Sequence, residues 1–497
     1  MGIKRYYPVT DNTITNSFKN DLATRATASN MGASDILETF VIHGQTSASI
    51  DAANAEQSRV LIKFPINTLL TDISNGVVPS SSVEYRLKMF NAPHASTIPL
   101  SYSLDVAMLT KTWSEGRGLD MDGYTDLGAS NWDEKAKNVK WTKPGSDYNG
   151  NGTHSSSYHF SGGVENLDLN IDFAIDKWRK YANATTNYGF LVKNTDTVIS
   201  GTLGTFYTKK FFGRSTQYFF NRPYIEARWD SSRKDNRGNF LISSSLLPGA
   251  DNINTLYLYN VVRGQLVNIP HIARNRLRVA AYTEKSNTSV PIEIVDSNNN
   301  SVTYVTGGLL FENGVEHAGI YTASFASTAS ADTIFDVWYT GSAHQGGTHT
   351  YYKTGSYSPQ SVNAKELLYD DEYITSVTNL QDSYRQGRKP RLRIFTRKEK
   401  WNPNVYTSVV AAVKPEIIDT AFYKVFRIID GLKVLSYGTG SYLETKMSYD
   451  VSGSYFDLDT TPLEPGFSYG IKFMYYLQGV YREQPEVFKF RIEEETP

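Results

Sequence analysis

The chain has 497 residues, with 50 Lys and Arg against 51 Asp and Glu, and it contains no Cys. A net charge of −1 at pH 7 gives no long-range attraction for a polyanion, so we expect neither a general nucleic-acid binder nor electrostatic attachment to a membrane. The missing cysteine excludes disulfides, thiolate metal sites and a Cys nucleophile. At roughly 100 to 200 residues per domain, the length predicts about three domains.

The aromatic content is high, with 34 Tyr, 24 Phe and 7 Trp beside 36 Gly. Tyr, Phe, Thr and Val favour strands, whereas Gly, Asn and Asp favour the turns between them. The composition therefore predicts an all-β protein. No apolar run reaches the length of a signal-peptide core or of a membrane span, so we expect a soluble chain that is made in a cytoplasm.

The first predicted domain covers residues 1–232. In SRVLIKFPI, the residues Val60, Ile62 and Phe64 share one face of a strand, as a two-residue period requires. One helix is expected in this part of the chain, at 169–181, because apolar residues recur there every three or four positions, with acids early and bases late. Strands are predicted at 58–66, 85–90 and 104–109.

A charged stretch without apolar periodicity, DSSRKDNRGN at 230–239, predicts the first domain boundary. The second domain is expected at 238–345, where short alternating segments are separated by turn signals such as DSNNNS and ENG. Its strands are predicted at 256–262, 277–282, 292–295, 302–305, 320–325 and 334–339. Their number and spacing fit an immunoglobulin-like sandwich.

A second boundary is predicted at 342–361, where Gly, Ser, Thr and Tyr dominate. The third domain, 363–497, alternates again, most cleanly in RLRIFTR. Its strands are predicted at 373–377, 391–397, 406–413, 422–429, 434–437, 469–476 and 486–492. The predicted fold is therefore all-β and multidomain, with an N-terminal sandwich followed by two immunoglobulin-like or related β-sandwich domains.

Eight motifs of the first domain occur in one order: DNTIT, SNMGASDIL, RVLIKF, TKTWSEG, ASNW, a helix ending in DKW, NYGFLVKN and RPYIEARW. In this order they resemble the DNRLRE-type domain, over residues 1–232. The resemblance implies a jelly-roll β-sandwich, similar to carbohydrate-binding modules, that is an accessory domain in cell-surface and virion proteins.

Four segments of the second half carry another resemblance: YITSVTNLQDSY, RLRIFTRKEKWNPNVYT, AFYKVFRIIDGLKVLSYGTGS and SYDVSGSYFDLDTTPLEPGFSYGIKF. They look similar to structural proteins of contractile-tailed, T4-like phages, particularly those of the marine, cyanophage type. This resemblance implies a virion protein that is assembled in the host bacterial cytoplasm. Capsid, neck, tail and fibre positions all stay open.

The loop TKTWSEGRG has two interpretations. In the first, Trp113 buries its ring against a sheet edge while Glu115 and Gly116 form the turn, because large aromatic side chains dominate core energetics. In the second, Trp113, Trp132 and Trp141 form an exposed interface or a platform on which sugar rings stack, which would be a conspicuous apolar patch. The first interpretation is favoured, and the sequence does not show which of the rings are exposed.

The segment RQGRKPRLRIFTRKEK at 385–400 is the one basic concentration in the chain. One interpretation is a contact with an acidic neighbour or with phosphates. The other is a solvated strand face, because half of the charges alternate along a strand. The candidate contact residues are Arg385, Arg388, Arg391, Arg393 and Arg397.

The sequence contains no HExxH, GxSxG or P-loop motif and no GxGxxG followed by a helix, so we expect no enzyme, no cofactor and no metal site. The eight His are scattered, and His154 and His159 are expected in a solvated loop. The acidic pairs of LDMDGY and FDLDTTPLE lack the full calcium-loop pattern and are interpreted as solvated faces. Asn151 starts a glycosylation pattern that we interpret as a turn.

The sequence therefore predicts a non-enzymatic structural protein of a tailed-phage virion, which forms a homo-oligomer and binds other virion proteins. Rigid β-domains with exposed strand edges offer surfaces for such contacts, and abundant Tyr suits interfaces. The alternative is a peripheral virion protein that binds a glycan or host receptor. No nucleic acid, membrane or cofactor is expected as a partner. A polysaccharide depolymerase is the weakest hypothesis, because the sequence lacks long β-helix repeats.

Overall fold

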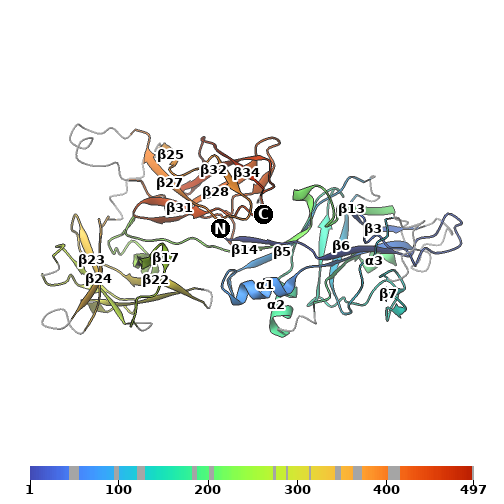
Figure 1. Cartoon of the computed structure of the whole chain (residues 1–497), viewed down its shortest axis with the longest axis horizontal. Coiled ribbons are helices and arrows are strands. Elements are labelled where there is room, and N and C mark those ends of the chain that lie inside the picture. The colour runs from blue at the N-terminus through green and yellow to red at the C-terminus, as the bar shows by residue number, and fades with distance from the viewer. Residues whose placement is uncertain are drawn as a thin grey trace. The chain divides into compact units, whose positions relative to one another are not determined.

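The computed structural model describes residues 1–43, 55–94, 100–119, 129–181, 187–200, 206–272, 276–286, 289–312, 315–341, 349–361, 372–400 and 415–494. Antiparallel strands predominate, which confirms the all-β multidomain prediction (Figure 1). The chain divides into two compact units. We call Ile3–Arg228 the N-terminal unit, and Met1–Gly2 with Trp229–Pro497 the C-terminal unit. The second and third predicted domains thus lie in one unit. None of the described helices is long and apolar enough to cross a membrane.

Two large antiparallel sheets and one separate two-stranded sheet form the described part of the N-terminal unit. The smaller sheet has the order β1 (Ile3–Tyr6), β14 (Tyr224–Arg228), β5 (Glu84–Met89), β11 (Leu167–Asn170). The larger sheet has the order β10 (Ser155–Phe160), β6 (Tyr102–Leu109), β12 (Phe190–Asn194), β4 (Glu56–Lys63), β3 (Ile36–Ile42), β13 (Phe206–Phe212). Beside this order, β2 (Thr10–Thr15) pairs with β4, β9 (Tyr148–Asn149) pairs with β6, and β7 (Glu134–Ala136) pairs with β8 (Val139–Lys140).

The core of the N-terminal unit follows from alternation along the strands. In β5, Tyr85, Leu87 and Met89 are buried, and the residues between them are partly exposed. Strand β4 differs, because nearly all of its residues are buried and it pairs with β2, β3 and β12. Burial of both alternating sets shows that β4 is covered on both faces.

The described helices of the N-terminal unit are α1 (Ile66–Ser74), α2 (Asp172–Tyr181), α3 (Asp196–Ile199) and the 3₁₀ turn η2 (Phe219–Asn221). The helix expected at 169–181 begins three residues later than predicted, because Leu169 pairs with Leu87 in the smaller sheet. The sequence interpretation missed α1, although its buried Ile66 and Leu69 have helical spacing.

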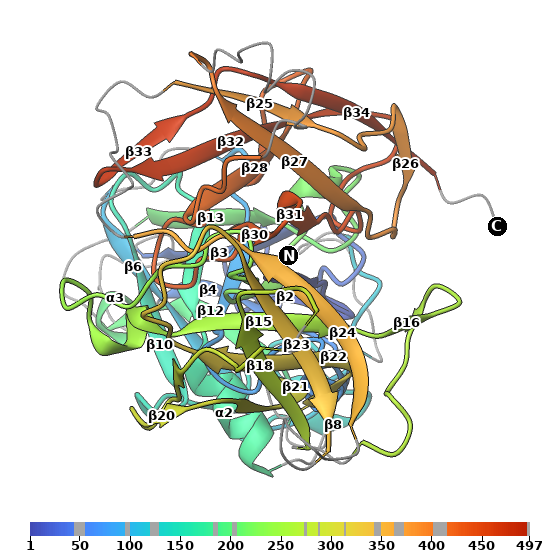
Figure 2. The same ribbon diagram turned by 90° about the vertical axis from the view of Figure 1, so that its left-hand side faces the viewer.

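Within the C-terminal unit, we call residues 230–361 the middle lobe and residues 372–494 the terminal lobe. The described sheet of the middle lobe has the order β15 (Asn254–Tyr259), β22 (Val315–Phe325), β21 (Val305–Glu312), β18 (Leu277–Tyr282), β23 (Ile334–Thr340), β24 (Thr350–Tyr357) (Figure 2). Smaller elements are the hairpin β16 (Val261–Val262) and β17 (Gln265–Leu266), the pair β19 (Ile294–Val295) and β20 (Ser301–Val302), and the 3₁₀ turn η3 (Gly249–Asn252).

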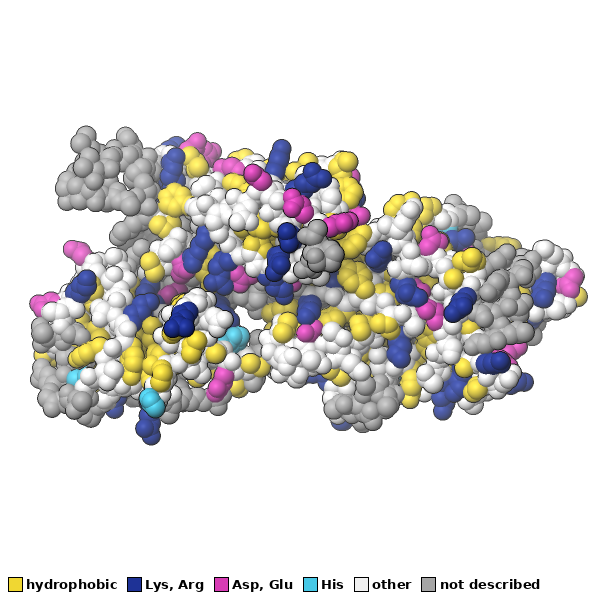
Figure 3. Space-filling view, viewed as in Figure 1, with side chains coloured by type: hydrophobic (Ala, Val, Ile, Leu, Met, Phe, Trp, Pro, Cys, Tyr) yellow, Lys and Arg dark blue, Asp and Glu magenta, His cyan; other side chains and the backbone are white. Residues whose placement is uncertain are grey.

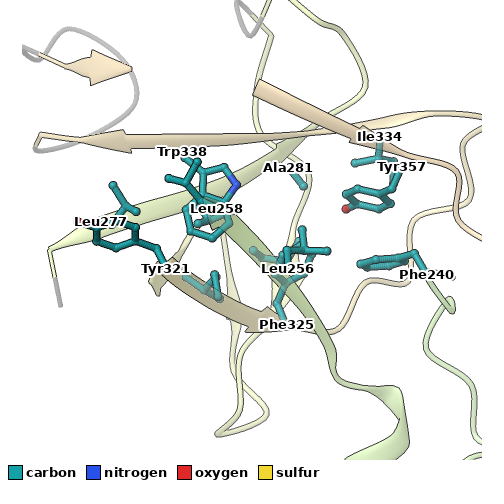
Figure 4. Close-up of a cluster of buried hydrophobic side chains, with 14 residues drawn as sticks. Phe240, Leu256, Leu258, Leu277, Ala281, Tyr321, Phe325, Ile334, Trp338 and Tyr357 are labelled. Carbon is teal, nitrogen blue, oxygen red and sulfur yellow. The ribbon is translucent and has the colours of Figure 1, made fainter. Parts of the chain in front are cut away.

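One face of this sheet carries the core of the middle lobe (Figure 4). Trp338 of β23 and Tyr321 of β22 are fully buried there, and Ile294 of β19 packs against the same cluster. Phe240, which precedes the sheet, stacks on Tyr357 of β24 with 4.2 Å between the ring centroids. The first and last parts of the lobe are therefore joined by aromatic packing.

Two segments that were predicted as domain boundaries are structured. Thr350–Tyr357 forms strand β24, although the sequence predicted a boundary at 342–361. In the stretch 230–239, Lys234 forms a bridge with Tyr449 of the terminal lobe, and Arg237 is buried. Both segments therefore take part in the fold of the C-terminal unit, which their polar composition did not indicate.

Two sheets also form the described part of the terminal lobe. The first has the order β25 (Tyr373–Val377), β27 (Arg391–Lys398), β31 (Gly453–Asp457), β30 (Ser448–Asp450). The second has the order β26 (Ser383–Arg385), β34 (Phe488–Glu493), β32 (Ser468–Leu477), β28 (Ala421–Arg427), β29 (Lys433–Leu435), and β33 (Val480–Glu483) pairs with β32. The pair β26 and β34 is parallel. The strand predicted at 406–413 lies outside the described residues.

Candidate functional site

The loop TKTWSEGRG is held to the N-terminal unit by hydrogen bonds and an ion pair. The Glu115 carboxylate accepts the Asp11 backbone N–H at 2.8 Å and pairs with Arg214 through two bonds, at 2.9 and 2.8 Å. A Cβ at Gly116 would overlap the buried side chain of Asn30, so only glycine fits there. The loop therefore acts as a structural connection.

The three candidate Trp residues lie in one buried cluster with Ile14, Leu61, Leu109 and Leu191. Trp132 is 7% and Trp141 is 5% exposed, while Trp113 is partly buried and donates its indole N–H to the Tyr188 carbonyl at 2.9 Å. Trp132 and Trp141 thus have almost no ring surface for a sugar or a partner. Their assignment as a glycan-stacking platform or interface is corrected, because packing in the core occupies their faces.

Asp11 in this region carries a perturbed carboxyl group. The side chain is 1% exposed and accepts the Arg214 backbone N–H at 2.7 Å. Burial raises the pKa of Asp11 to about 6, although Arg214 opposes that rise. The native state therefore holds a proton on Asp11 in a pH range where the unfolded chain has lost it.

We expect Asp11→Asn to change the pH dependence of stability. With a folded pKa near 6 and an unfolded value of 3.8, the stability that Asp11 contributes is complete below the lower value and is lost as pH rises through the higher one. The unfolding free energy of the variant minus that of the natural chain should therefore rise by about 2 kcal/mol between pH 4.5 and 7.5. Urea unfolding at both pH values measures it. A difference that is the same at both pH values would contradict this prediction, and Asp35→Asn, at an exposed position of the same unit, is the control.

The basic segment separates into paired and unpaired residues. Arg391 contacts Asp457 through two bonds of 2.7 and 3.0 Å, and Arg393 contacts Asp450 at 2.7 Å. Both guanidinium groups also lie over the Tyr455 ring, at 4.6 and 4.9 Å from its centroid. Of the five candidate contacts, Arg391 and Arg393 are therefore already neutralised within the chain.

Arg385, Arg388 and Arg391 line one pocket of about 530 Å³, together with Lys389 and Glu493. We call this the basic pocket. Lys389 pairs with Asp459 at 3.0 Å. Within the described residues, the guanidinium groups of Arg385 and Arg388 have no ion-pair partner. Arg393 and Arg397 do not line the pocket, and Arg397 donates to the Lys398 carbonyl at 3.2 Å.

The hairpin β16–β17 is a feature that the sequence interpretation missed. Val261, Val262, Leu266 and Val267 are 55, 50, 42 and 43% exposed, so apolar side chains cover both faces of the hairpin. A two-residue turn joins its strands, with Arg263 and the following glycine both at positive φ. The dipeptide Arg-Gly between two aliphatic runs was the available signal, but Val261 and Val262 were predicted as the end of a strand at 256–262, and no strand was predicted directly after the glycine.

The root of this hairpin is fixed by the side chains of two asparagines. The Asn260 side chain donates to the Val267 carbonyl at 2.6 Å, and the Asn268 side chain accepts the Gly319 N–H at 2.7 Å. Asn260 also donates its backbone N–H to the Gly319 carbonyl at 2.8 Å. The hairpin is therefore held against β22 at its base while its aliphatic side chains face solvent. Figure 3 shows hydrophobic side chains gathered on the surface over β17 and β22.

A cleft of about 910 Å³ lies between the middle and terminal lobes. There the Asp419 carboxylate accepts Lys234 Nζ at 2.9 Å and the Tyr449 hydroxyl at 3.1 Å. Burial would raise the pKa of Asp419, but Lys234 lowers it below its usual value. The carboxylate thus stays charged and paired, which suits a contact between lobes better than proton transfer.

The other candidates from the sequence lie apart from these features. No cluster of metal-binding side chains occurs in the described ranges. His159 lies in strand β10 beside Ser103, at 3.2 Å, so the prediction of a loop is corrected for this residue. Asn151 lies in a turn, as predicted. Asp457 and Asp459 pair with bases of the basic pocket, and the LDMDGY pair, Asp120 and Asp122, lies outside the described residues.

No protein-family model and no curated protein matches this chain. Among solved structures, the titin domains Z1Z2 in complex with telethonin are similar at 12% identity and a TM-score of 0.14, over 49% of this chain and 89% of the titin chain. A DUF4785 family protein from Legionella pneumophila is similar at 8% identity and a TM-score of 0.13, over 98% of this chain and 90% of that one. Likenesses with such TM-scores carry no argument about fold or function.

Proposed function

We propose that this protein is a non-enzymatic structural component of a tailed-phage virion, assembled in the host bacterial cytoplasm from copies of itself and other virion proteins. The observation that carries the proposal is the hairpin β16–β17, with four exposed aliphatic side chains on a fixed root. Exposed apolar surface is unfavourable in water, and another subunit that covers it removes that cost.

The size of the effect decides what kind of assembly the hairpin supports. Burying a fully exposed Val or Leu side chain contributes about 1.5–3 kcal/mol of favourable free energy. These four side chains are only about half exposed, so covering each one contributes about half of that value. Covering all four therefore contributes on the order of 4 kcal/mol, which is no larger than the cost of bringing two molecules together. Assembly through this hairpin should be weak and dependent on concentration, and further contacts must strengthen it in the particle.

We expect the triple variant Val261→Thr, Val262→Thr, Leu266→Thr to lose this self-association. Threonine keeps the strand propensity and places a hydroxyl on the exposed surface. Light scattering coupled to size-exclusion chromatography over a range of concentrations measures the mass of each chain. The matched control replaces Leu246 and Val290 by Thr, because both are exposed in the same lobe but lie outside the hairpin.

The natural chain and the control should increase in mass with concentration, whereas the triple variant should stay monomeric. A natural chain that stays monomeric at every concentration would contradict self-assembly. If such a monomer also binds envelope polysaccharide on a glycan array, the function is that of a peripheral glycan-binding virion protein. The burial of Trp132 and Trp141 removes the stacking surface on which that alternative depended.

A further inference from the structure

Two cations of the basic pocket, Arg385 and Arg388, form no ion pair with an acid of the described residues, whereas other bases of the pocket do. Arg391 is neutralised by Asp457 and Lys389 by Asp459, through contacts of 2.7 and 3.0 Å. Within the described residues, no acid forms an ion pair with Arg385 or Arg388, both of which are exposed. Lys389, Arg391 and Arg393 of the same segment pair with Asp459, Asp457 and Asp450, so Arg385 and Arg388 differ from these three neighbours.

The backbone that carries these two arginines is fixed. The buried Thr460 hydroxyl lies 3.0 Å from the Arg385 carbonyl and 2.9 Å from the Arg388 carbonyl. The side chain of Gln386 donates to the Leu463 carbonyl at 2.8 Å. Gly387 adopts a positive φ of 81° between them, as a tight turn requires. Holding the turn in advance reduces the entropy that binding would otherwise cost.

The charge of the pocket indicates what it can bind. After the internal pairs are removed, Arg385 and Arg388 remain against Glu493, which leaves a net charge of +1. A guanidinium pair recognises carboxylates and phosphates alike. One carboxylate brings this net charge to zero, whereas a phosphate monoester, with a charge of about −1.5 to −2 at neutral pH, would leave the pocket negative.

We propose that the basic pocket binds a carboxylate side chain on an extended acidic segment of a neighbouring protein in the particle. This inference rests on the proposed assembly function. Strand β26 contributes Ser383, Tyr384 and Arg385 to the pocket wall and is the outermost described strand of its sheet. An extended segment can therefore lie along β26 and place its carboxylate between the two guanidinium groups.

The test measures binding of a fluorescent peptide of six glutamates to the full chain by fluorescence anisotropy. We expect Arg385→Gln with Arg388→Gln to weaken binding about tenfold or more, because both unpaired charges are removed. The matched control is Lys433→Gln with Lys489→Gln, which removes the same charge from exposed positions of the same lobe. The control should bind within about twofold of the natural chain, and binding to the natural chain should weaken as salt rises.

Equal binding by the pocket variant and the control would overturn the inference. So would stronger competition by inorganic phosphate than by acetate, which would assign the pocket to phosphate groups. Light scattering tests the proposed function independently, because it measures self-association rather than binding of the peptide. The pocket variant keeps the hairpin β16–β17, so we expect it to self-associate like the natural chain. If the variants bind the peptide alike while the natural chain still self-associates, the inference alone fails. If the natural chain stays monomeric, the proposed function fails.

Discussion

Glu226→Gln is expected to lower the unfolding free energy of the N-terminal unit by about 3–5 kcal/mol, because it removes a buried negative charge that lies against three partly buried cations. Glu226 is 2% exposed and accepts Arg5 Nε at 2.8 Å and Arg228 Nε at 2.7 Å, with Lys88 Nζ at 3.7 Å. Glutamine has nearly the same size, so the loss reports the charge rather than a cavity.

The position of Arg5 explains why Glu226→Gln should destabilise strand β1 at the start of the N-terminal unit. Arg5 lies in β1, opposite Glu226 in β14, and its guanidinium group lies 4.6 Å from the centre of the Tyr224 ring. Without the carboxylate, the nearly buried Arg5 loses the acid that lies opposite it in β14. Strand β1 is paired on one side only in the described sheet, so it should separate from β14 first.

Hydrogen exchange of peptides from β1 and β14, with urea unfolding, measures this loss. Burial would raise the pKa of Glu226, but Arg5, Lys88 and Arg228 lower it to about 2. The contribution is therefore present above the ordinary carboxyl pKa of 4.5 and is lost as pH falls toward 2, so the variant and the natural chain should converge in acid. Asp176→Asn, on an exposed position of α2, is the control. Unchanged exchange in β1 would contradict the prediction.

The sequence predicted some strand bounds correctly. The predicted ranges 277–282 and 373–377 coincide with β18 and β25. In β25 the buried residues Tyr373 and Thr375 follow the two-residue period, whereas in β18 both alternating sets are buried, because Ala280 and Tyr282 pack in a second cluster. The strong aromatic and β-branched composition likewise predicted the all-β class.

The candidate sites depend on contacts that are distant in the sequence, and those could not be predicted. Whether Arg391 is free depends on Asp457, 66 residues away, and whether Trp113 is exposed depends on Tyr188, 75 residues away. A basic run shows its positive charges but not the acids on the neighbouring strand. The sequence could therefore indicate the basic segment, while only the fold separates Arg385 and Arg388 from their paired neighbours.

Strand β24 of the middle lobe is a second case in which contacts between residues distant in the sequence could not be predicted. Its sequence, TYYKTGSY, resembles a linker because it contains glycine, serine and threonine. Gly355 lies opposite Asp336 in β23, and a Cβ there would meet Asp336 Oδ1 at 2.5 Å and Arg237 Nε at 2.9 Å. The glycine is thus required by a buried ion pair whose members are 99 residues apart, rather than by chain flexibility.

This ion pair gives the second large effect that we expect. Asp336 is fully buried and pairs with Arg237 Nη2 at 2.6 Å, and it accepts the indole N–H of Trp338 at 2.7 Å. Arg237 also pairs with Asp235 at 2.9 Å, and these acids together raise its pKa although burial opposes the rise. The guanidinium group therefore stays charged inside the lobe and needs both carboxylates.

Asp336→Asn should lower the unfolding free energy of the middle lobe by about 3–5 kcal/mol, because a buried guanidinium group loses one of its two acids while the shape of the site is kept. Hydrogen exchange of peptides from β23 and β24 measures the loss, since Asp336 joins both strands to Arg237. Asp332→Asn, which changes an exposed carboxylate just before β23, should leave that exchange unaltered. If both variants exchange like the natural chain, the pair does not hold β24 in the sheet, and packing of Tyr357 on Phe240 is sufficient to keep it there.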